Sequence, residues 1–272
     1  MTRSDWGAVS KGWESRADAF RSATMPVASW MIDHTAPQVG QTVLDLAAGI
    51  GDTGFLAAEL IEPGGTLITS DVVPEMLAAA QRRAQSLGIR NARFKQIDAS
   101  LPIDIEAASI DVVLCRWGYM LMDDPEHALR ETRRILRPGG RVALAAWTTA
   151  EDNPWSAVPV KMLVDRGLVD PIEPGSGPGG QFAWGEEGIV AEHIEAAGFV
   201  DYEVEALEFP IHYASVEAWW ATARTMGMRA SEARIPDEAE WIAALADAAR
   251  DWTADDGSLA IPAKTWMAGG TG

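Results

Sequence analysis

Short apolar runs alternate with amphipathic segments along the middle of the chain, and this alternation predicts the secondary structure. The run 110–116, Ile-Asp-Val-Val-Leu-Cys-Arg, is short and largely apolar, which is typical of a buried strand. The segment 74–87 instead repeats apolar residues at helical spacing and is followed by Gly88, the residue type favoured just beyond a helix. The same criteria predict further strands at 43–46, 66–70, 93–97, 141–147, about 199–209 and about 258–267, and further helices at 53–62, 125–136, 186–197, about 215–229 and about 236–252.

Strands that alternate with helices predict βαβ units, in which helices cover both faces of a mostly parallel sheet. The predicted fold class is therefore α/β, with a doubly wound, mostly parallel, seven-stranded sheet of Rossmann-like type. Residues 1–36 have a helical pattern in pieces and are expected to form an N-terminal cover, ahead of a Rossmann-like domain over 37–272. Within that domain, the stretches at about 150–185 and about 213–255 interrupt the alternation and are interpreted as insertions.

The 272 residues suit one large domain, and their charge narrows the range of partners. Lys and Arg number 22 against 40 Asp and Glu, which gives a formal net charge of −18. Nucleic acids and anionic membranes are bound through clustered Lys and Arg, so neither is an expected partner. Cys115 is the single cysteine, so no disulfide can form within the chain.

The sequence has neither the pattern of a secretion signal nor that of a membrane span. Its first twenty residues lack an apolar stretch of signal-peptide type, and no window approaches the roughly 18–20 apolar residues that a spanning helix needs. We therefore expect a soluble, cytoplasmic protein. No metal site is predicted, and a homodimer is compatible with the sequence.

A glycine-rich loop follows the strand 43–46. Glycines let the backbone pass close to a ligand, and the N–H groups at the start of the next helix favour anionic groups. Ligands of open α/β sheets bind at this place, beyond the carboxyl ends of the strands. Residues 49–54, Gly-Ile-Gly-Asp-Thr-Gly, match the dinucleotide-binding pattern GxGxxG, and Asp71 lies near the spacing expected of an acid that holds a ribose. Taken alone, this motif fits a NAD-dependent dehydrogenase.

Four further features accompany the loop. Asp45 lies inside the strand before the glycines, and the second strand ends at Asp71. The third strand leads into Asp98-Ala99, and the fourth strand and its helix lead into Arg-Pro-Gly-Gly at 137–140 and a fifth strand. In this order and spacing, residues 40–148 resemble the class I S-adenosylmethionine-dependent methyltransferases. The similarity is greatest to the small-molecule branch that includes the ubiquinone and menaquinone C-methyltransferases.

The resemblance implies that S-adenosylmethionine lies along the carboxyl ends of the first strands, with its methionine end at the glycine-rich loop. In detail, it implies that Asp45, Ala47, Gly49 and Gly51 face the methionine moiety, Asp71 the ribose hydroxyls, Val72, Met76, Asp98 and Ala99 the adenine, Arg116 and Trp117 the opening of the pocket, and Trp13 the sulfonium through a cation–π contact. Asp45 would lie toward the ammonium group. Ala47 stands where many family members carry the first glycine. Because alanine is small and keeps its N–H, little loss of binding is expected.

The tryptophans bear on the substrate. Of the 12 in the chain, Trp117 and Trp147 alone fall within residues 43–148. The others lie in the N-terminal helices and the C-terminal half, which cover the substrate pocket in the family. An aromatic cover excludes water and suits a flat or apolar molecule. The expected reaction is methyl transfer to an O, N or C centre of a small, apolar or aromatic metabolite.

A general base assists this transfer when the acceptor must lose a proton. Of the four histidines, His212 follows the strand that ends at Phe209 and is the one expected at the rim of the pocket, so it is the candidate catalytic residue. Two alternatives remain. A NAD-dependent dehydrogenase would use the same loop but gives no reason for Asp45 and Asp98. A non-catalytic cofactor-binding subunit would bind S-adenosylmethionine without methyl transfer.

Overall fold

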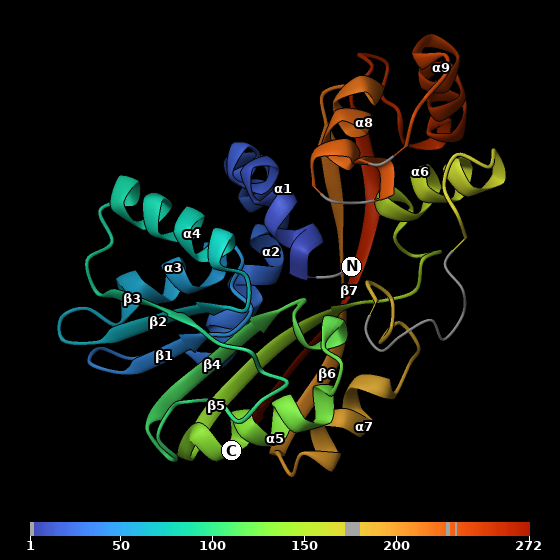
Figure 1. Cartoon of the computed structure of the whole chain (residues 1–272). Coiled ribbons are helices and arrows are strands. Elements are labelled where there is room, and N and C mark those ends of the chain that lie inside the picture. Colours follow the sequence, from blue (N-terminus) through green and yellow to red (C-terminus); the bar gives the residue numbers. More distant parts are fainter. Residues whose placement is uncertain (1–2, 172–179, 227–228, 232) are drawn as a thin grey trace.

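The computed structural model describes residues 3–171, 180–226, 229–231 and 233–272, and within them one seven-stranded sheet forms the centre of the molecule (Figure 1). The strand order is β3-β2-β1-β4-β5-β7-β6. β7 runs antiparallel to β5 and β6, and the other neighbouring strands are parallel. The predicted doubly wound, mostly parallel α/β sheet is confirmed. The strands are β1 (Thr42–Asp45), β2 (Thr66–Asp71), β3 (Ala92–Gln96), β4 (Ile110–Arg116), β5 (Leu136–Trp147), β6 (Val200–Tyr213) and β7 (Leu259–Thr271).

Helices pack on both faces of the sheet and extend beyond one end of it. α2, α3 and α4 contact one face, and α5 and α7 contact the other (Figure 1). α6, α8 and α9 gather at the far end of the long β6–β7 pair, in a group that we call the cover (Figure 1). The helices are α1 (Arg3–Ser15), α2 (Ala17–Thr35), α3 (Asp52–Leu60), α4 (Pro74–Leu87), α5 (Pro125–Ile135), α6 (Pro154–Asp165), α7 (Ile189–Ala196), α8 (Val216–Thr225) and α9 (Glu238–Ala248), with short 3-10 turns η1 (Tyr119–Leu121), η2 (Arg229–Ser231) and η3 (Arg250–Trp252).

Local sequence explains where the helices of the sheet domain begin and end. α4 has Pro74 at its first position, and Gly88 follows it with a φ of 74°, a left-handed conformation that glycine adopts without strain. α5 begins after Asp124, whose side chain accepts a hydrogen bond from the N–H of His127. The central strands are buried because helices cover both of their faces.

Four elements differ from the sequence prediction. β5 begins at Leu136 rather than at 141, because the Pro-Gly-Gly segment forms a bulge between the pairs Ile110–Leu136 and Val112–Arg141. β6 and β7 run on to Tyr213 and Thr271, since they pair with each other over most of their lengths. α6 forms within the stretch 150–185, where two prolines obscure the helical pattern. Residues 172–179 of that stretch lie outside the described residues.

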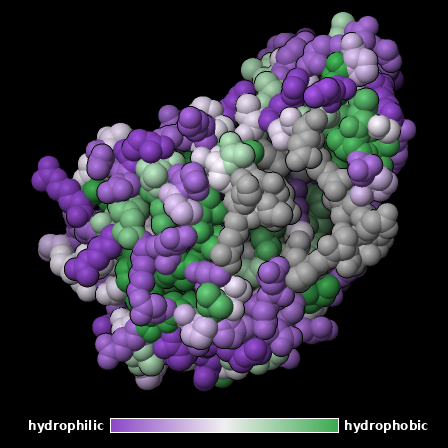
Figure 2. All heavy atoms as spheres, in the orientation of Figure 1, coloured by the Kyte–Doolittle hydropathy of each residue, from purple (hydrophilic) through white to green (hydrophobic). Residues whose placement is uncertain are grey.

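Hydrophilic residues dominate the face of the molecule that Figure 2 shows, and hydrophobic residues gather in its lower middle and in a smaller patch on the cover. Within the described residues, no helix has the length and apolar character to cross a membrane.

Candidate functional site

The loop between β1 and α3 turns sharply at the carboxyl end of the sheet. Ala47, Gly49 and Gly51 have φ angles of 54°, 55° and 91°, so three residues within five are left-handed. At Gly51 a Cβ atom would lie 2.4 Å from the ring of Phe55, which only glycine avoids. Within the loop, the N–H of Ala48 donates to the carbonyl of Ser70 and the N–H of Gly51 to the carbonyl of Ala48, so the backbone itself fixes the turn.

Asp45 ends β1 beneath this loop. Its carboxyl is 1% exposed and accepts a hydrogen bond from the N–H of Gly54 over 2.8 Å. A Cβ on Gly54 would come within 2.6 Å of the same oxygen, so glycine lets α3 start close to the strand. Burial raises the pKa of Asp45 to about 7, against the opposing effects of the Gly54 N–H and the Arg116 charge. A cation bound nearby would therefore favour the ionised form.

Asp71 ends β2 and joins the two adjacent loops. One oxygen accepts a hydrogen bond from the N–H of Gly49 and the other from the N–H of Val73, each over 2.9 Å. Burial raises its pKa, and these N–H groups oppose the shift. A carboxylate offers about four lone-pair sites. Two sites therefore remain for further donors, such as a pair of hydroxyl groups.

Asp98 lies in the loop after β3. It accepts hydrogen bonds from the N–H of Ser100 over 3.1 Å and from its hydroxyl over 2.6 Å. The following residue, Ala99, is buried. Asp45 and Asp71 thus end β1 and β2, and Asp98 follows the adjacent β3 at the same edge of the sheet, in the order that the sequence predicts.

α1 lies over this edge, beside α4 (Figure 1). Trp13 of α1, together with the half-buried Val72, packs against a small apolar cluster that includes Met76. The Trp13 indole N–H donates to the carbonyl of Met226, 3.1 Å away, and its ring meets the ring of Phe20 edge-on at 4.8 Å. Trp13 and Met76 are therefore neighbours next to the glycine-rich loop.

A buried cluster of charges connects the loop to the helices around it. Arg116, at the end of β4, donates to the hydroxyl of Thr24 over 2.6 Å and lies 3.5 Å from a carboxylate oxygen of Asp52. Arg83 of α4 lies 2.8 Å from the other oxygen of Asp52 and donates to the carbonyl of Ile50. Burial lowers the pKa of Arg116, and the Asp52 charge opposes this shift. The cluster fixes the start of α3 against α2, α4 and β4.

An array of aromatic rings extends from Arg116 toward the cover. Trp117 stacks on Trp147 at a centroid distance of 4.1 Å and donates its indole N–H to Thr265 of β7. Phe20 lies 6.0 Å from Trp117 on one side, and Trp155 lies 5.1 Å from Trp147 on the other. Phe20 of α2, Trp117 directly after β4, Trp147 of β5 and Trp155 of α6 thus form one connected aromatic cluster, whose three tryptophans are buried.

Comparison with known proteins agrees with this arrangement. A model of the methyltransferase domain matches residues 37–167. Nocamycin O-methyltransferase of Saccharothrix syringae is 29% identical over 240 residues, which cover 84% of each chain. Demethylmenaquinone methyltransferase of Thermus thermophilus is 34% identical over 113 residues, 42% of this chain and 50% of that enzyme. The chain is a class I S-adenosylmethionine-dependent methyltransferase. The fold of the YcgJ protein from Bacillus subtilis matches 91% of the chain with a TM-score of 0.60 at 22% identity.

The matches to methyltransferases decide between the two interpretations of the glycine-rich loop. The dehydrogenase alternative had no explanation for Asp45 and Asp98 at the edge of the sheet. In this methyltransferase Asp45 accepts a hydrogen bond from Gly54 at the start of α3, and Asp98 follows β3 at the same edge of the sheet.

His212, the histidine expected at the rim of the pocket, lies within β6 opposite Ala260 of β7. Its side chain is exposed, whereas Phe209 and Ile211 on the other face of the strand are buried. Successive side chains of a strand point to opposite faces, so His212 is directed to solvent while Tyr213 is half-buried. The structure of the methyltransferase does not bring His212 to the glycine-rich loop, and its role as a base stays a prediction.

Asp52 and Arg83 are not among the site residues predicted from the sequence. A signal for the pair exists, because Arg83 falls two helical turns after Met76 on the apolar face of α4. An unpaired charge in such a position is costly, so a basic residue there predicts an acidic partner. Asp52, directly after Gly51 at the start of α3, is that partner.

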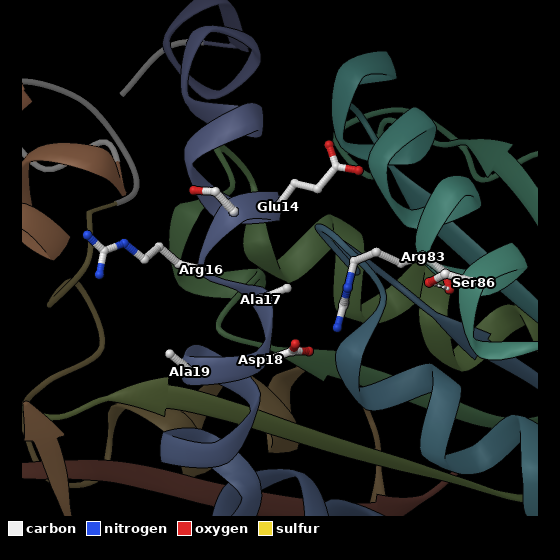
Figure 3. Close-up of a pocket in the computed structure, with 8 residues that line it drawn as sticks. Glu14, Arg16, Ala17, Asp18, Ala19, Arg83 and Ser86 are labelled. Carbon is white, nitrogen blue, oxygen red and sulfur yellow. Dashed lines mark hydrogen bonds between the residues drawn. The ribbon is translucent and has the colours of Figure 1, made fainter.

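A hollow of about 560 Å³ opens between α4 and the junction of α1 with α2 (Figure 3). Residues 14–19 line one side, and Arg83 and Ser86 line the other. In Figure 3, Glu14 and Arg83 lie on the α4 side of the junction, and Arg16 extends to the opposite side. The predicted cofactor residues do not line this hollow. Arg83, which does line it, donates a hydrogen bond to the carbonyl of Ile50 in the glycine-rich loop.

Proposed function

We propose that this methyltransferase binds S-adenosylmethionine across the carboxyl ends of β1, β2 and β3 and methylates an O, N or C centre of a small apolar or aromatic metabolite. The observation that carries the second part is the array of Phe20, Trp117, Trp147 and Trp155. It begins beside the glycine-rich loop and ends in the cover. A molecule held against it would lie in contact with apolar rings on the side where the methyl group is presented.

Three carboxyls support the proposed placement of the cofactor. Asp45, buried with a raised pKa, suits a position near the ammonium group, which would favour its ionised form. Asp71 keeps two acceptor sites for the ribose hydroxyls, and Asp98 would accept from the adenine amino group. The backbone of Ala47, Gly49 and Gly51 would approach the methionine moiety, with Val72 and Met76 on the adenine and the Ala99 N–H toward a ring nitrogen.

Three further residues would lie at the opening of the pocket. Arg116 and Trp117 would border the methionine end. Trp13 would lie on the sulfonium side of the pocket, because its ring faces Phe20 next to the loop.

The chain's own contribution to the reaction is alignment and exclusion of water. When bound, S-adenosylmethionine supplies a methyl group on a positively charged sulfur that a nucleophile can displace in line. Trp117 and Trp147 would hold the flat face of the acceptor, which reduces the entropy lost in reaching the reactive geometry. Trp13 and α1 would close the site from above and keep water from the reacting atoms.

Oxygen has the most support among the three acceptor atoms. Nocamycin O-methyltransferase, whose name specifies an oxygen acceptor, is similar over 84% of each chain. Aklanonic acid methyltransferase of a Streptomyces strain, which acts on an acid, is 31% identical over 44% of this chain. An assay of labelled methyl transfer to phenols, aromatic acids, quinones and amines tests the proposal. We expect label in oxygen-methylated products. Binding of S-adenosylhomocysteine without transfer to any small molecule would contradict it and favour the non-catalytic alternative.

The aromatic array makes a separate prediction about the acceptor. Trp147→Phe replaces the indole that lies between Trp117 and Trp155 with a smaller ring. We therefore expect the KM for the acceptor to rise about three- to tenfold, in line with the roughly 1 kcal/mol that one aromatic pair contributes. The affinity for S-adenosylhomocysteine should stay within about twofold of the wild-type value, since Trp147 lies outside the glycine-rich loop. Trp252→Phe, in η3 and outside the array, is the matched control. An unchanged KM in Trp147→Phe would remove the array from the acceptor site.

A further inference from the structure

Arg16 differs in its surroundings from the arginines of the site. It lies between the end of α1 and the start of α2, and its side chain is half-buried. Arg82, Arg83 and Arg116 each have a carboxylate partner. Among the described residues, the Arg16 guanidinium has neither an ion pair nor a hydrogen-bond partner. A half-buried cation without a counter-charge is available to an anion that comes from outside.

The Arg16 side chain extends to the side of the α1–α2 junction opposite α4 (Figure 3). Glu14 lies on the α4 side of the junction, where Arg82 binds it through two hydrogen bonds of 2.9 and 2.7 Å. Arg16 extends away from that side, toward the C-terminal segments drawn in orange (Figure 3). Trp13 precedes Arg16 in the chain and Phe20 follows it, and both belong to the rings beside the glycine-rich loop.

Tyr213, the last residue of β6, provides a second polar group near Arg16. Burial raises the pKa of its hydroxyl, and the positive charge of Arg16 opposes that shift. The Tyr213 ring packs near Trp219 of α8, at a centroid distance of 6.4 Å. Within the described part of the chain, the Tyr213 hydroxyl has no hydrogen-bond partner.

We propose that Arg16 and Tyr213 together recognise a carboxylate on the acceptor of this methyltransferase. A guanidinium matches the planar geometry of a carboxylate, and a phenol adds one further donor. The surrounding rings suit the apolar body of the same molecule. With a net charge of −18 the protein repels anions at long range, so an acidic acceptor needs such a local cation. This inference rests on the proposed function and narrows its acceptor to small aromatic or apolar carboxylic acids.

Paired probes test the inference. The enzyme, saturated with S-adenosylhomocysteine, is titrated calorimetrically with 2-naphthoate and with 2-naphthamide, which has the same rings and no charge. We expect naphthoate to bind at least tenfold more tightly. Arg16→Gln should abolish this preference, and Tyr213→Phe should reduce it about threefold. Lys11→Gln, which removes an exposed charge from α1, should leave it unchanged.

Two outcomes overturn the inference. In the first, the wild-type protein binds the two probes equally or binds neither. In the second, the Arg16→Gln variant still prefers naphthoate to naphthamide. Binding of S-adenosylhomocysteine is measured for each protein in the same series. If the wild type binds it and shows no preference for naphthoate, the inference fails alone. If the wild type does not bind it, the proposed function fails as well.

Discussion

At the scale of single residues, burial determines how the carboxyls at the edge of the sheet behave. Asp45 and Asp71 are almost fully buried, and burial raises the pKa of each. Backbone N–H groups of Gly54, Gly49 and Val73 partly compensate by hydrogen bonding to the charged forms. The loop conformation and the carboxyls therefore depend on each other, since the same N–H groups fix both.

The raised pKa of Asp45 predicts a pH-dependent stability. In the unfolded chain the carboxyl ionises near its ordinary value of 3.8, whereas in the folded protein it keeps its proton to about 7. The free energy of unfolding should therefore fall as the pH rises from about 4 to about 7. Asp45→Asn cannot ionise, so its stability relative to wild type should improve by about 1–3 kcal/mol between pH 5 and pH 8. Urea unfolding at both pH values measures this difference, and an equal difference at the two would contradict the account.

At the scale of elements, α1 connects the sheet domain to the cover. On one side Glu14 pairs with Arg82 of α4. On the other, Gly12 packs directly against the carbonyl of Thr225 at the end of α8, and Trp13 bonds to the carbonyl of Met226. The contacts join parts of the chain that would otherwise meet only through the sheet, so α1 is expected to control access to the cofactor.

Gly12→Ala tests this role of α1. A Cβ at this position would lie 2.0 Å from the Thr225 carbonyl oxygen, so α1 must shift away from α8. Alanine favours a helix over glycine by about 1 kcal/mol, so global stability should not fall by much. We expect S-adenosylhomocysteine to dissociate about tenfold faster, as followed by tryptophan fluorescence in stopped flow. Ser15→Ala, exposed on the same helix, is the control, and equal release rates in the two variants would exclude α1 as a gate.

The start of α6 depends on one buried amide. Asn153 accepts hydrogen bonds from the N–H of Lys264 and the indole of Trp155, and it donates to the carbonyls of Thr149 and Lys264. It therefore joins the end of β5 to β7 and to α6. Asn153→Ala leaves several buried groups unpaired and should lower the free energy of unfolding by about 2–4 kcal/mol. A loss below about 0.5 kcal/mol in thermal or urea unfolding would show that this junction is held in another way.

At the scale of the whole molecule, the predictable part of the fold is the part with a local signal. The alternation of strands and helices, the loop after β1, and the acids that end β1, β2 and β3 all follow from patterns within a few residues. The partners of these elements lie far along the chain. Trp117 bonds to Thr265, and Trp30 of α2 bonds to Glu205 of β6. Periodicity carries no information about such contacts, which is why the aromatic array emerges only in the structure.

The C-terminal strands show a second reason why the sequence predicts the fold only in part. β6 and β7 pair with each other well beyond the body of the sheet, so their length reflects tertiary pairing rather than propensity. The sequence predicts His212 just beyond a strand that ends at Phe209. In the structure His212 lies inside this longer strand, and the alternation of side chains directs it to solvent. A shift of one residue in such a strand exchanges a half-buried residue, here Tyr213, for an exposed one.

The central claim, that the loop after β1 and Asp71 hold S-adenosylmethionine, is tested most directly by calorimetry with S-adenosylhomocysteine and with NAD. We predict that S-adenosylhomocysteine binds the wild type once per chain and that NAD gives no binding heat. Asp71→Ala removes two charge-assisted hydrogen bonds and should weaken binding at least tenfold, whereas the exposed Asp255→Ala should not. Binding of NAD in place of S-adenosylhomocysteine, or an unchanged affinity in a folded Asp71→Ala protein, would contradict the account.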